Sequence, residues 1–184
     1  MEGPLLKYPP SFKVPESGVF SISPHNHSTK ETNVELYPHN VFPSSITGLP
    51  GHRIKNVQLE DIEIIYEGGA QKRRTSIPAD SLHIITEAAA NYPEFSMFGE
   101  LPAWGMYLRH LEGISIKNVM LKYKQDDFRI PIIMDDVQRV NISNLQIPTA
   151  MQAPVLWLQK TTDITIDRIR SPFSLPASIK TVDH

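Results

Sequence analysis

The chain has 184 residues, of which 40% are hydrophobic and 21% are charged, and its formal net charge is −2. This composition suits one globular domain and argues against a chain that is disordered throughout. A net charge so close to zero argues against a nucleic-acid backbone as the main partner, because phosphate binding needs a basic face. The sequence contains no cysteine, so disulfides and cysteine-ligated zinc sites are excluded.

The first 40 residues are the hardest part of the chain to interpret. Four prolines fall within the first 18 residues, and no apolar run there is long enough for a signal peptide. No segment of the sequence is long and apolar enough to span a membrane. We expect residues 1–40 to form an N-terminal cap or an irregular segment, in which Asn33-Val34-Glu35-Leu36 could be one strand of an earlier coil.

A short motif of alternating apolar residues first occurs in a coil at residues 41–65 and then recurs. Its last three copies begin at Leu108, Met134 and Leu158, at spacings of 26 and 24 residues, and they align without a gap. The first copy runs from Ile54 to Ile62. A period of two with many β-branched residues is typical of half-buried strands. A repeat of this length without helical periodicity predicts a β-solenoid.

Residues that favour turns flank these strands at matching positions. Asparagine, aspartate and glycine tolerate a left-handed backbone or cap their own turn. The positions are Asn56, Gly113 and Asp163 before the second strand, and Asp61, Asn118 and Asn144 after it. The sequence therefore predicts a turn at both ends of this strand.

Stacking of the copies predicts three specific side-chain contacts. Equivalent residues of neighbouring parallel strands lie about 4.8 Å apart, so equivalent side chains meet. The expected contacts are Asn118 with Asn144, Arg109 with Asp135, and Asp136 between His110 and Lys160.

Residues 66–105 interrupt the repeat and predict a long loop excursion. The equivalent residues Val57 and Ile114 are 57 positions apart, which is far more than one coil. The excursion is rich in aromatic residues, which need a surface to pack on, and residues 81–90 could form a short helix. Long excursions on solenoids often gather on the binding face. After it, residues 106–170 predict three stacked coils and residues 171–184 a C-terminal tail, all within a single all-β domain.

Several segments spread over roughly residues 40–170 carry a further pattern. They are Ser44–His52 with Ile54–Val57, Tyr92-Pro93-Glu94 with Met97-Phe98-Gly99, Leu101–Tyr107, Arg109-His110, and Met134–Val137. Together these segments resemble the late coils of glycoside hydrolase family 28 proteins of gut bacteria.

The resemblance implies a right-handed parallel β-helix of the pectin-lyase type, with about four to five coils and the one long excursion. It also implies hydrolysis of galacturonan-type pectin with inversion, no cofactor, a pectic oligo- or polysaccharide as partner, and a periplasmic or extracellular location. The signal for export is not expected within this chain.

The catalytic motifs of that family are not reproduced here. Its Asn-Thr-Asp motif is absent, and Gly51-His52 is followed by Arg53 where the family has a second glycine. Arg53-Ile54-Lys55 spells a third motif but adjoins Gly51-His52, whereas the family keeps these two motifs far apart. We therefore assign no catalytic residue, and we expect the catalytic coils to lie outside this chain.

Asp135-Asp136 is the candidate pair for the two carboxyls of a glycosidase. Inverting hydrolysis needs two carboxyls about 6.5–9.5 Å apart with room for a water molecule. The coil neighbours of the pair are expected to be Arg109, His110 and Lys160, which favours charge-paired structural residues. Such pairing would lower both pKa values, which is unsuitable for a general acid.

A second group of residues is the candidate sugar-binding surface. Aromatic rings pack on sugar rings, and arginine binds the carboxylates of uronic acids in a bidentate manner. The candidates are Tyr92, Glu94, Trp104, Tyr107, Arg109 and His110. The alternative is that Tyr92 and Trp104 only clamp the excursion onto the coil.

The remaining interpretations concern metals and assembly. His25 and His27, with His39 or His52, match no metal-binding signature, so no metal site is expected. Two functions stay open: the C-terminal part of a pectin hydrolase, or a non-catalytic β-helix that binds carbohydrate or self-associates. Self-association would use the ends of the coil stack, where strand edges are exposed.

Overall fold

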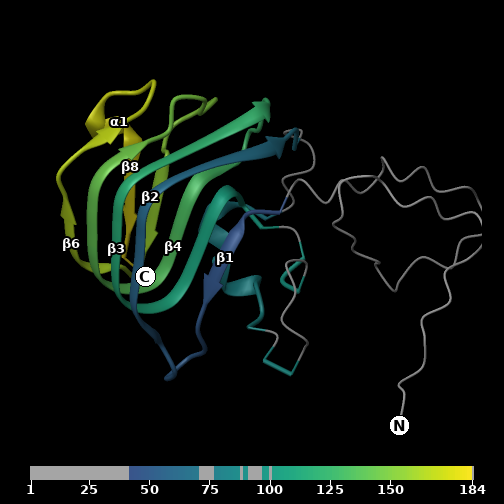
Figure 1. Ribbon diagram of the computed structural model, residues 1–184. Helices are drawn as coiled ribbons and strands as arrows, with labels where there is room; N and C mark the ends of the chain where they lie inside the picture. Colours follow the sequence, from purple (N-terminus) through teal and green to yellow (C-terminus); the bar gives the residue numbers. More distant parts are fainter. Residues whose placement is uncertain (1–41, 71–76, 88, 91–96, 100, 184) are drawn as a thin grey trace, which may run out of the picture. The chain divides into compact units, whose positions relative to one another are not determined.

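The computed structural model describes residues 42–70, 77–87, 89–90, 97–99 and 101–183. All of them belong to one compact unit that spans residues 40–184. Their regular structure is almost entirely β-strand, and the strands form one eight-stranded sheet in which every pair is parallel (Figure 1). The predicted all-β class is confirmed.

The strands succeed one another with little helix between them. They are β1 (Ser44–Thr47), β2 (Ile54–Gly68), β3 (Ala103–Gln125), β4 (Ile130–Gln146), β5 (Leu156–Gln159), β6 (Thr162–Ile166), β7 (Ile169–Arg170) and β8 (Ile179–Val182). A 3₁₀ helix, η4 (Ala79–Ile84), lies between β2 and β3, and a four-residue helix, α1 (Leu175–Ser178), precedes β8.

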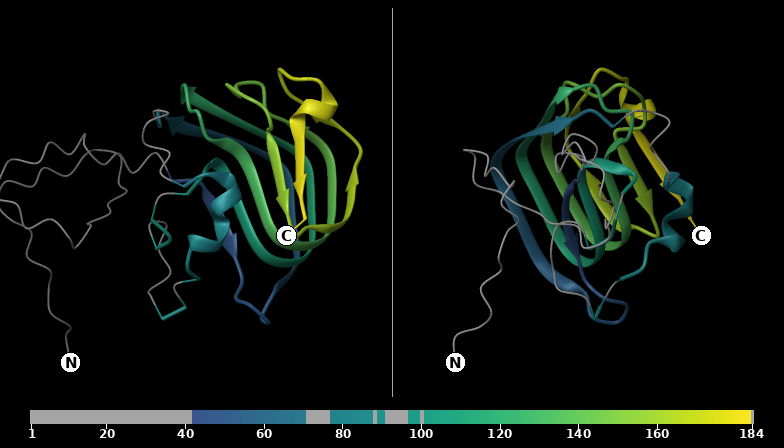
Figure 2. Two further views of the ribbon diagram at one scale, coloured as in Figure 1. Left: turned by 180° about the vertical axis from the view of Figure 1, so that it is seen from behind. Right: turned by 90° about the vertical axis from the view of Figure 1, so that its right-hand side faces the viewer.

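Each pass of the chain through the sheet, here called a rung, lies on the previous one. Strand β3 pairs with β1 and β2 on one edge and with β4 on the other, and β4 then pairs with β5, β6 and β7. Strand β5 pairs in turn with β8. Figure 2 shows β3 and β4 as long ribbons that curve in the same sense beside each other.

The register of the rungs is the one that the repeat predicts. Val57 pairs with Ile114, Ile114 with Val140, and Val140 with Ile164. These residues face inward, and Ile114 and Val140 are each 2% exposed. The alternation of apolar and polar residues therefore builds one continuous core from neighbouring rungs.

The rungs bend at corners where residues with a left-handed backbone stack on one another. Asn56, Gly113, Arg139 and Asp163 share the first such corner and all have positive φ. Asp61, Asn118 and Asn144 share the second, and His110, Asp136 and Lys160 share the third. The turns predicted from asparagine, aspartate and glycine are present, but the left-handed backbone of Arg139 and Lys160 was not anticipated.

A second, smaller core lies on the outer face of the sheet, near the start of β3 and β4. Leu82, Ile85 and Leu101 of the excursion pack there against Tyr107 and Ile133. This is the packing surface that the aromatic-rich excursion was expected to need. The helix predicted at residues 81–90 is present only as η4, which is shorter and of the 3₁₀ type.

A buried ion pair holds both ends of the excursion. Asp127 is 0% exposed, and its carboxylate accepts hydrogen bonds from Arg129 Nε at 3.0 Å and Nη2 at 2.7 Å. The same carboxylate accepts one from the backbone N–H of Ala70 at 3.3 Å, and Arg129 Nη1 donates to the carbonyl of Leu101 at 3.5 Å. Ala70 at the start of the excursion and Leu101 at its end are thus both held by the Asp127–Arg129 pair.

Two predicted boundaries need correction. Strand β2 continues to Gly68 and β3 already begins at Ala103, so the excursion is shorter than residues 66–105 at both ends. Residues 171–184 are more than a tail, because they contain α1 and β8, and β8 adds a parallel strand beside β5. Residues 1–40, with the strand considered at Asn33–Leu36, lie outside the described residues.

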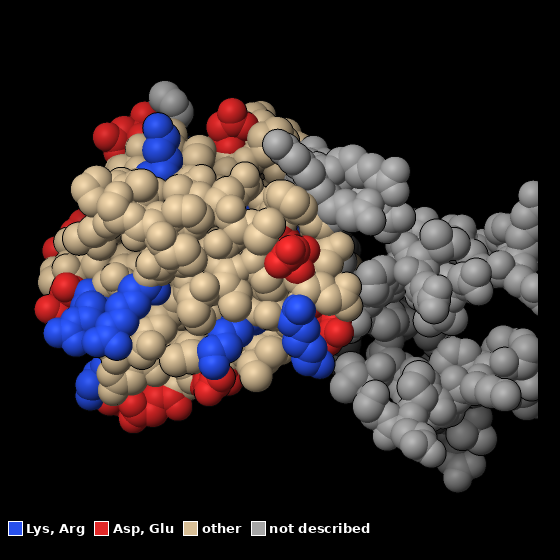
Figure 3. Space-filling view, turned by 90° about the horizontal axis from the view of Figure 1, so that it is seen from above, with Lys and Arg blue, Asp and Glu red and all other residues tan. Residues whose placement is uncertain are grey.

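The outer surface of the described part mixes both signs of charge. Lys117, Lys122 and Lys124 of β3 form ion pairs with Glu60, Glu63 and Glu67 of β2. On the face seen in Figure 3, basic and acidic side chains are interspersed. Among the described residues, no helix is long and apolar enough to cross a membrane.

Candidate functional site

Two of the predicted sugar-binding aromatics, Trp104 and Tyr107, are buried. Trp104 is 1% exposed and lies in the main core, where its ring meets those of Tyr66 and Tyr123 edge-on, with centroids 5.6 and 5.2 Å away. Tyr107 is 0% exposed and lies under the excursion, 6.4 Å from the ring of Phe98. In this arrangement neither ring offers a face to a sugar. Trp104 also packs inside the rungs rather than clamping the excursion.

Other predicted positions fall outside the described residues. Tyr92 and Glu94 are among them, so their role in sugar binding stays a prediction. His25, His27 and His39 are outside as well. Within the ranges that the structure describes, no three histidine, aspartate or glutamate side chains come together as metal ligands.

Arg109 connects two rungs with the excursion. Its Nε lies 3.0 Å from Oδ2 of Asp135, an ion pair that lacks the alignment of a hydrogen bond. Its Nη1 donates to the carbonyl of Ile85 at 2.7 Å, and its Nη2 lies 3.2 Å from Oε1 of Glu87. The predicted contact between Arg109 and Asp135 is confirmed, and the two excursion partners are additional.

His110 lies between two carboxylates at the adjoining corner. Its Nδ1 is 2.6 Å from Oδ2 of Asp136, as predicted, and its Nε2 is 3.3 Å from Oε1 of Glu87. Arg53 also contacts Asp136, and its Nη2 lies 2.5 Å from Oδ1 of that carboxylate. Lys160, the predicted second neighbour, occupies the next position of the same corner.

A loop between β1 and β2 brings Arg53 to this corner. Thr47 pairs with Arg109, and Ile54 pairs with Leu111. The six residues 48–53 therefore form a loop opposite a single residue of β3, His110. Arg53 then reaches across β3, and its Nη1 donates to the carbonyls of Leu111 at 3.2 Å and Asp136 at 2.9 Å. The repeat alignment missed this contact because the loop has no counterpart in the other copies.

The loop starts with a glycine for a steric reason. A Cβ on Gly48 would lie 2.6 Å from the carbonyl oxygen of His110 and 2.8 Å from that of His52. Real side chains do not tolerate such distances to backbone atoms. The chain can therefore leave the sheet at this point only with a glycine.

The environment shifts the pKa values of the three carboxylates in different directions. Burial raises the pKa of Asp135, and the positive charge of Arg109 only partly offsets it. For Asp136, burial acts in the same sense, but hydrogen bonds from His110 and Arg53 outweigh it and leave the pKa below its ordinary value. At Glu87, burial is again outweighed, here by the hydrogen bond from His110 and the charge of Arg109, so the pKa is lowered. The expectation of two lowered aspartate pKa values is thus correct for Asp136 and wrong for Asp135.

The arrangement of this corner cluster (Arg53, Glu87, Arg109, His110, Asp135 and Asp136) is that of a structural crosslink. A raised pKa is the direction a general acid needs, but the Asp135 side chain is only 5% exposed and is held by Arg109. Asp136 is 27% exposed and is engaged by Arg53 and His110. Inverting hydrolysis needs a water molecule between the two carboxyls, and these carboxyls face cations instead.

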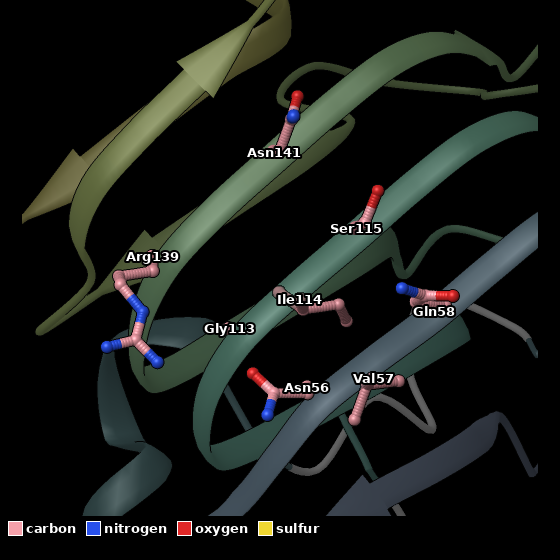
Figure 4. Close-up of a pocket in the computed structure, with 8 residues that line it drawn as sticks. All are labelled: Asn56, Val57, Gln58, Gly113, Ile114, Ser115, Arg139 and Asn141. Carbon is pink, nitrogen blue, oxygen red and sulfur yellow. The ribbon is translucent and has the colours of Figure 1, made fainter.

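A separate feature lies on the outer side of the rungs. A shallow depression of about 230 Å³ crosses β2, β3 and β4 (Figure 4). The residues that line it are Asn56, Val57, Gln58, Gly113, Ile114, Ser115, Arg139 and Asn141. The sequence indicated Asn56 and Gly113 only as turn residues, and the depression itself depends on the stacking of three rungs.

Comparisons with known proteins add no relative. No protein-family model, no curated protein and no solved structure matches this chain.

Proposed function

We propose that this chain is a non-catalytic section of a glycoside hydrolase that acts on pectic polygalacturonan, and that its sheet is a right-handed parallel β-helix. The observation that carries the proposal is the in-register column of Val57, Ile114, Val140 and Ile164. Such a column supports a solenoid in which each pass of the chain covers the last. Parallel strands joined within one sheet connect with a right-handed crossover in nearly all proteins.

The segments that resemble family 28 support the assignment further because they lie on neighbouring strands. Ser45 of β1 pairs with Tyr107 of β3, and Tyr107 pairs with Ile133 of β4. Residues that are far apart in the sequence thus lie side by side on neighbouring strands. On the same resemblance, we propose a periplasmic or extracellular location, where polymeric pectin is available.

The state of the aspartates supports a non-catalytic role for this section. Asp135 is buried against Arg109, and Asp136 is shared between His110 and Arg53. The acid and base of an inverting hydrolase would then belong to coils outside this chain. The contribution of this section would be to bind the polymer and to support those coils.

The test is a pair of measurements on the purified chain. We expect no reducing ends from polygalacturonate above a buffer blank, and heat release on titration with trigalacturonate in calorimetry. Robust turnover that both Asp135→Asn and Asp136→Asn abolish, but Asp126→Asn does not, would place the catalytic carboxyls in this chain. Asp126 is an exposed aspartate between β3 and β4, which makes it a control of the same charge away from the pair.

A third outcome separates the alternative function. Neither turnover nor binding, together with a concentration-dependent mass in sedimentation, would favour a self-associating β-helix. Association would then use the open edge of β2, which pairs only with β3 among the described strands. Its inward residues Val57, Leu59 and Ile62 are partly exposed, whereas their counterparts on β3 are buried.

A further inference from the structure

The depression on β2, β3 and β4 is a trough that follows β3. Its middle row, on β3, carries the small residues Gly113 and Ser115. Larger polar residues flank that row on both sides: Asn56 and Gln58 on β2, and Arg139 and Asn141 on β4. The trough exists because a rung with little side-chain volume lies between two rungs with more.

Gly113 lies on the middle row of the trough, between Asn56 and Arg139. It has φ +80°, and a Cβ there would lie 3.0 Å from Oδ1 of Asn56 and 3.5 Å from Nη2 of Arg139. In Figure 4 the side chains of Asn56 and Arg139 lie on either side of this position. A group of a ligand placed over Gly113 would therefore meet an amide on one side and a guanidinium on the other.

Two basic side chains lie at this end of the trough and share one carboxylate. Arg139 Nη1 lies 3.0 Å from Oε1 of Glu112, and the other oxygen of Glu112 lies 3.2 Å from Nζ of Lys55. One carboxylate is thus shared between two cations. The side chain of Arg139 is 53% exposed, so its guanidinium remains open to an anion from solvent.

The other groups are suited to sugar hydroxyls. Amide side chains such as those of Gln58 and Asn141 both donate and accept hydrogen bonds, as does the hydroxyl of Ser115. Both amide side chains are exposed, and Ser115 is half-buried. The depression measures about 230 Å³, below the roughly 300–1,000 Å³ of pockets for drug-sized ligands, so it offers contacts for about one ring of a longer ligand.

We propose that this trough is a binding subsite for one uronic acid unit of an acidic oligosaccharide. Arg139 holds the carboxylate, and Asn56, Gln58 and Asn141 bind hydroxyls. The choice of a uronic acid rests on the proposed function, whereas the place of binding rests on the geometry of the trough alone.

The test is an NMR titration of the ¹⁵N-labelled chain with trigalacturonate, with neutral galactotriose as the matched ligand. We expect saturable shifts of the backbone amides of the trough residues, larger for the acidic ligand. Gly113→Asn fills the trough, and asparagine keeps the left-handed backbone, as Asn56 does in the same corner. It is expected to abolish the shifts. Arg139→Asn is expected to weaken the binding of trigalacturonate at least about tenfold and to leave the affinity for galactotriose unchanged.

Controls keep the test decisive. Lys124→Gln removes an exposed cation that does not line the trough, and we expect no change in affinity beyond about twofold. Circular dichroism melting establishes that each variant is folded. If Gly113→Asn does not fold, the result for Arg139→Asn decides the test. Trigalacturonate that still binds both variants, or shifts that gather around Arg109 and His110, would overturn the subsite and leave the proposed function standing. Absence of shifts throughout the chain would overturn both.

Discussion

Nδ2 of Asn144 donates a hydrogen bond of 3.0 Å to Oδ1 of Asn118, one rung away, and Nδ2 of Asn118 donates one of 2.8 Å to Oδ1 of Asp61. All three residues have positive φ, between 51° and 59°. The corner therefore selects its residues twice. Asparagine and aspartate tolerate the left-handed backbone better than most residues. Their side chains also have the right length for Nδ2 of one residue to donate to Oδ1 of the equivalent residue on the neighbouring rung.

Substitution of Asn118 separates these two effects. Asn118→Ala removes two side-chain hydrogen bonds and places an ordinary residue in the left-handed region, and we expect a loss of about 2–4 kcal/mol in the free energy of unfolding. Asn118→Gly removes the same bonds but relieves the backbone, so its loss is expected to be smaller by about 1 kcal/mol. Urea denaturation measures both. Equal losses would show that backbone strain does not matter at this corner.

The buried pair of Asp127 and Arg129 yields a second prediction. Asp127→Asn breaks the buried ion pair with Arg129, and breaking a buried pair typically costs about 3–5 kcal/mol. The same change weakens the contacts to Ala70 and Leu101 that fix both ends of the excursion. We therefore expect a lower urea midpoint together with faster proteolysis between residues 70 and 101.

The neighbouring aspartate supplies the control for this experiment. Asp126 is exposed, so Asp126→Asn changes the net charge by the same amount without breaking the pair. We expect its free energy of unfolding to change by about 0.5 kcal/mol or less, as is usual for surface substitutions. A comparable loss in both variants would mean that the net charge, and not the buried pair, is responsible.

The opposite pKa shifts of Asp135 and Asp136 predict opposite effects on the pH dependence of stability. A lowered pKa means that ionised Asp136 contributes stability above its ordinary pKa of 3.8, and that this is lost as the pH falls through the lowered value. A raised pKa means that ionised Asp135 carries a penalty at neutral pH, which is relieved as the pH falls through the raised value.

The two asparagine variants should therefore differ in slope. In urea denaturation between pH 6 and about pH 2, Asp136→Asn is expected to lose stability less steeply than the unmodified chain, with the difference arising below pH 3.8. Asp135→Asn is expected to lose it more steeply, because the group that gains stability on protonation is gone. The slopes are compared rather than the absolute values, since both substitutions also disturb Arg109, His110 or Arg53. Slopes that change in the same direction would contradict the assignment.

The register of the rungs was predictable because a two-residue alternation fixes which side chains face inward. A shift of one residue would turn Val57 and Ile114 to solvent, so the sequence tolerates one alignment only. Strand β1 was less visible, since it has four residues and the loop at 48–53 separates it from β2. Short segments carry too few alternating positions to establish a period.

The candidate site was less predictable because its contacts join residues that come close only in the folded chain, and residue preferences do not reveal such contacts. Arginine and lysine have no particular affinity for the left-handed backbone, so residue type alone does not mark Arg139 or Lys160 as corner residues. An aromatic residue such as Trp104 suits a sugar-binding surface and a core equally well, and only packing decides between them. The contact of Arg53 with Asp136 spans 83 positions and requires the loop to be folded.

The second core provides the last prediction, which tests whether the excursion is anchored on the outer face of the sheet. Leu82 is 0% exposed and packs with Ile85, Tyr107 and Ile133, whereas Ile84, two positions away, is 53% exposed. Leu82→Ala is expected to cost about 2–5 kcal/mol, as is usual for a large buried side chain, and Ile84→Ala about 0.5 kcal/mol or less. Urea denaturation gives the totals, and hydrogen exchange locates the effect. If Leu82 anchors the excursion, the amides of Arg109 and Asp135 beneath it lose protection in Leu82→Ala and keep it in Ile84→Ala. Equal protection in the two variants would mean that the ion pairs of Arg109 hold the excursion without the apolar contact.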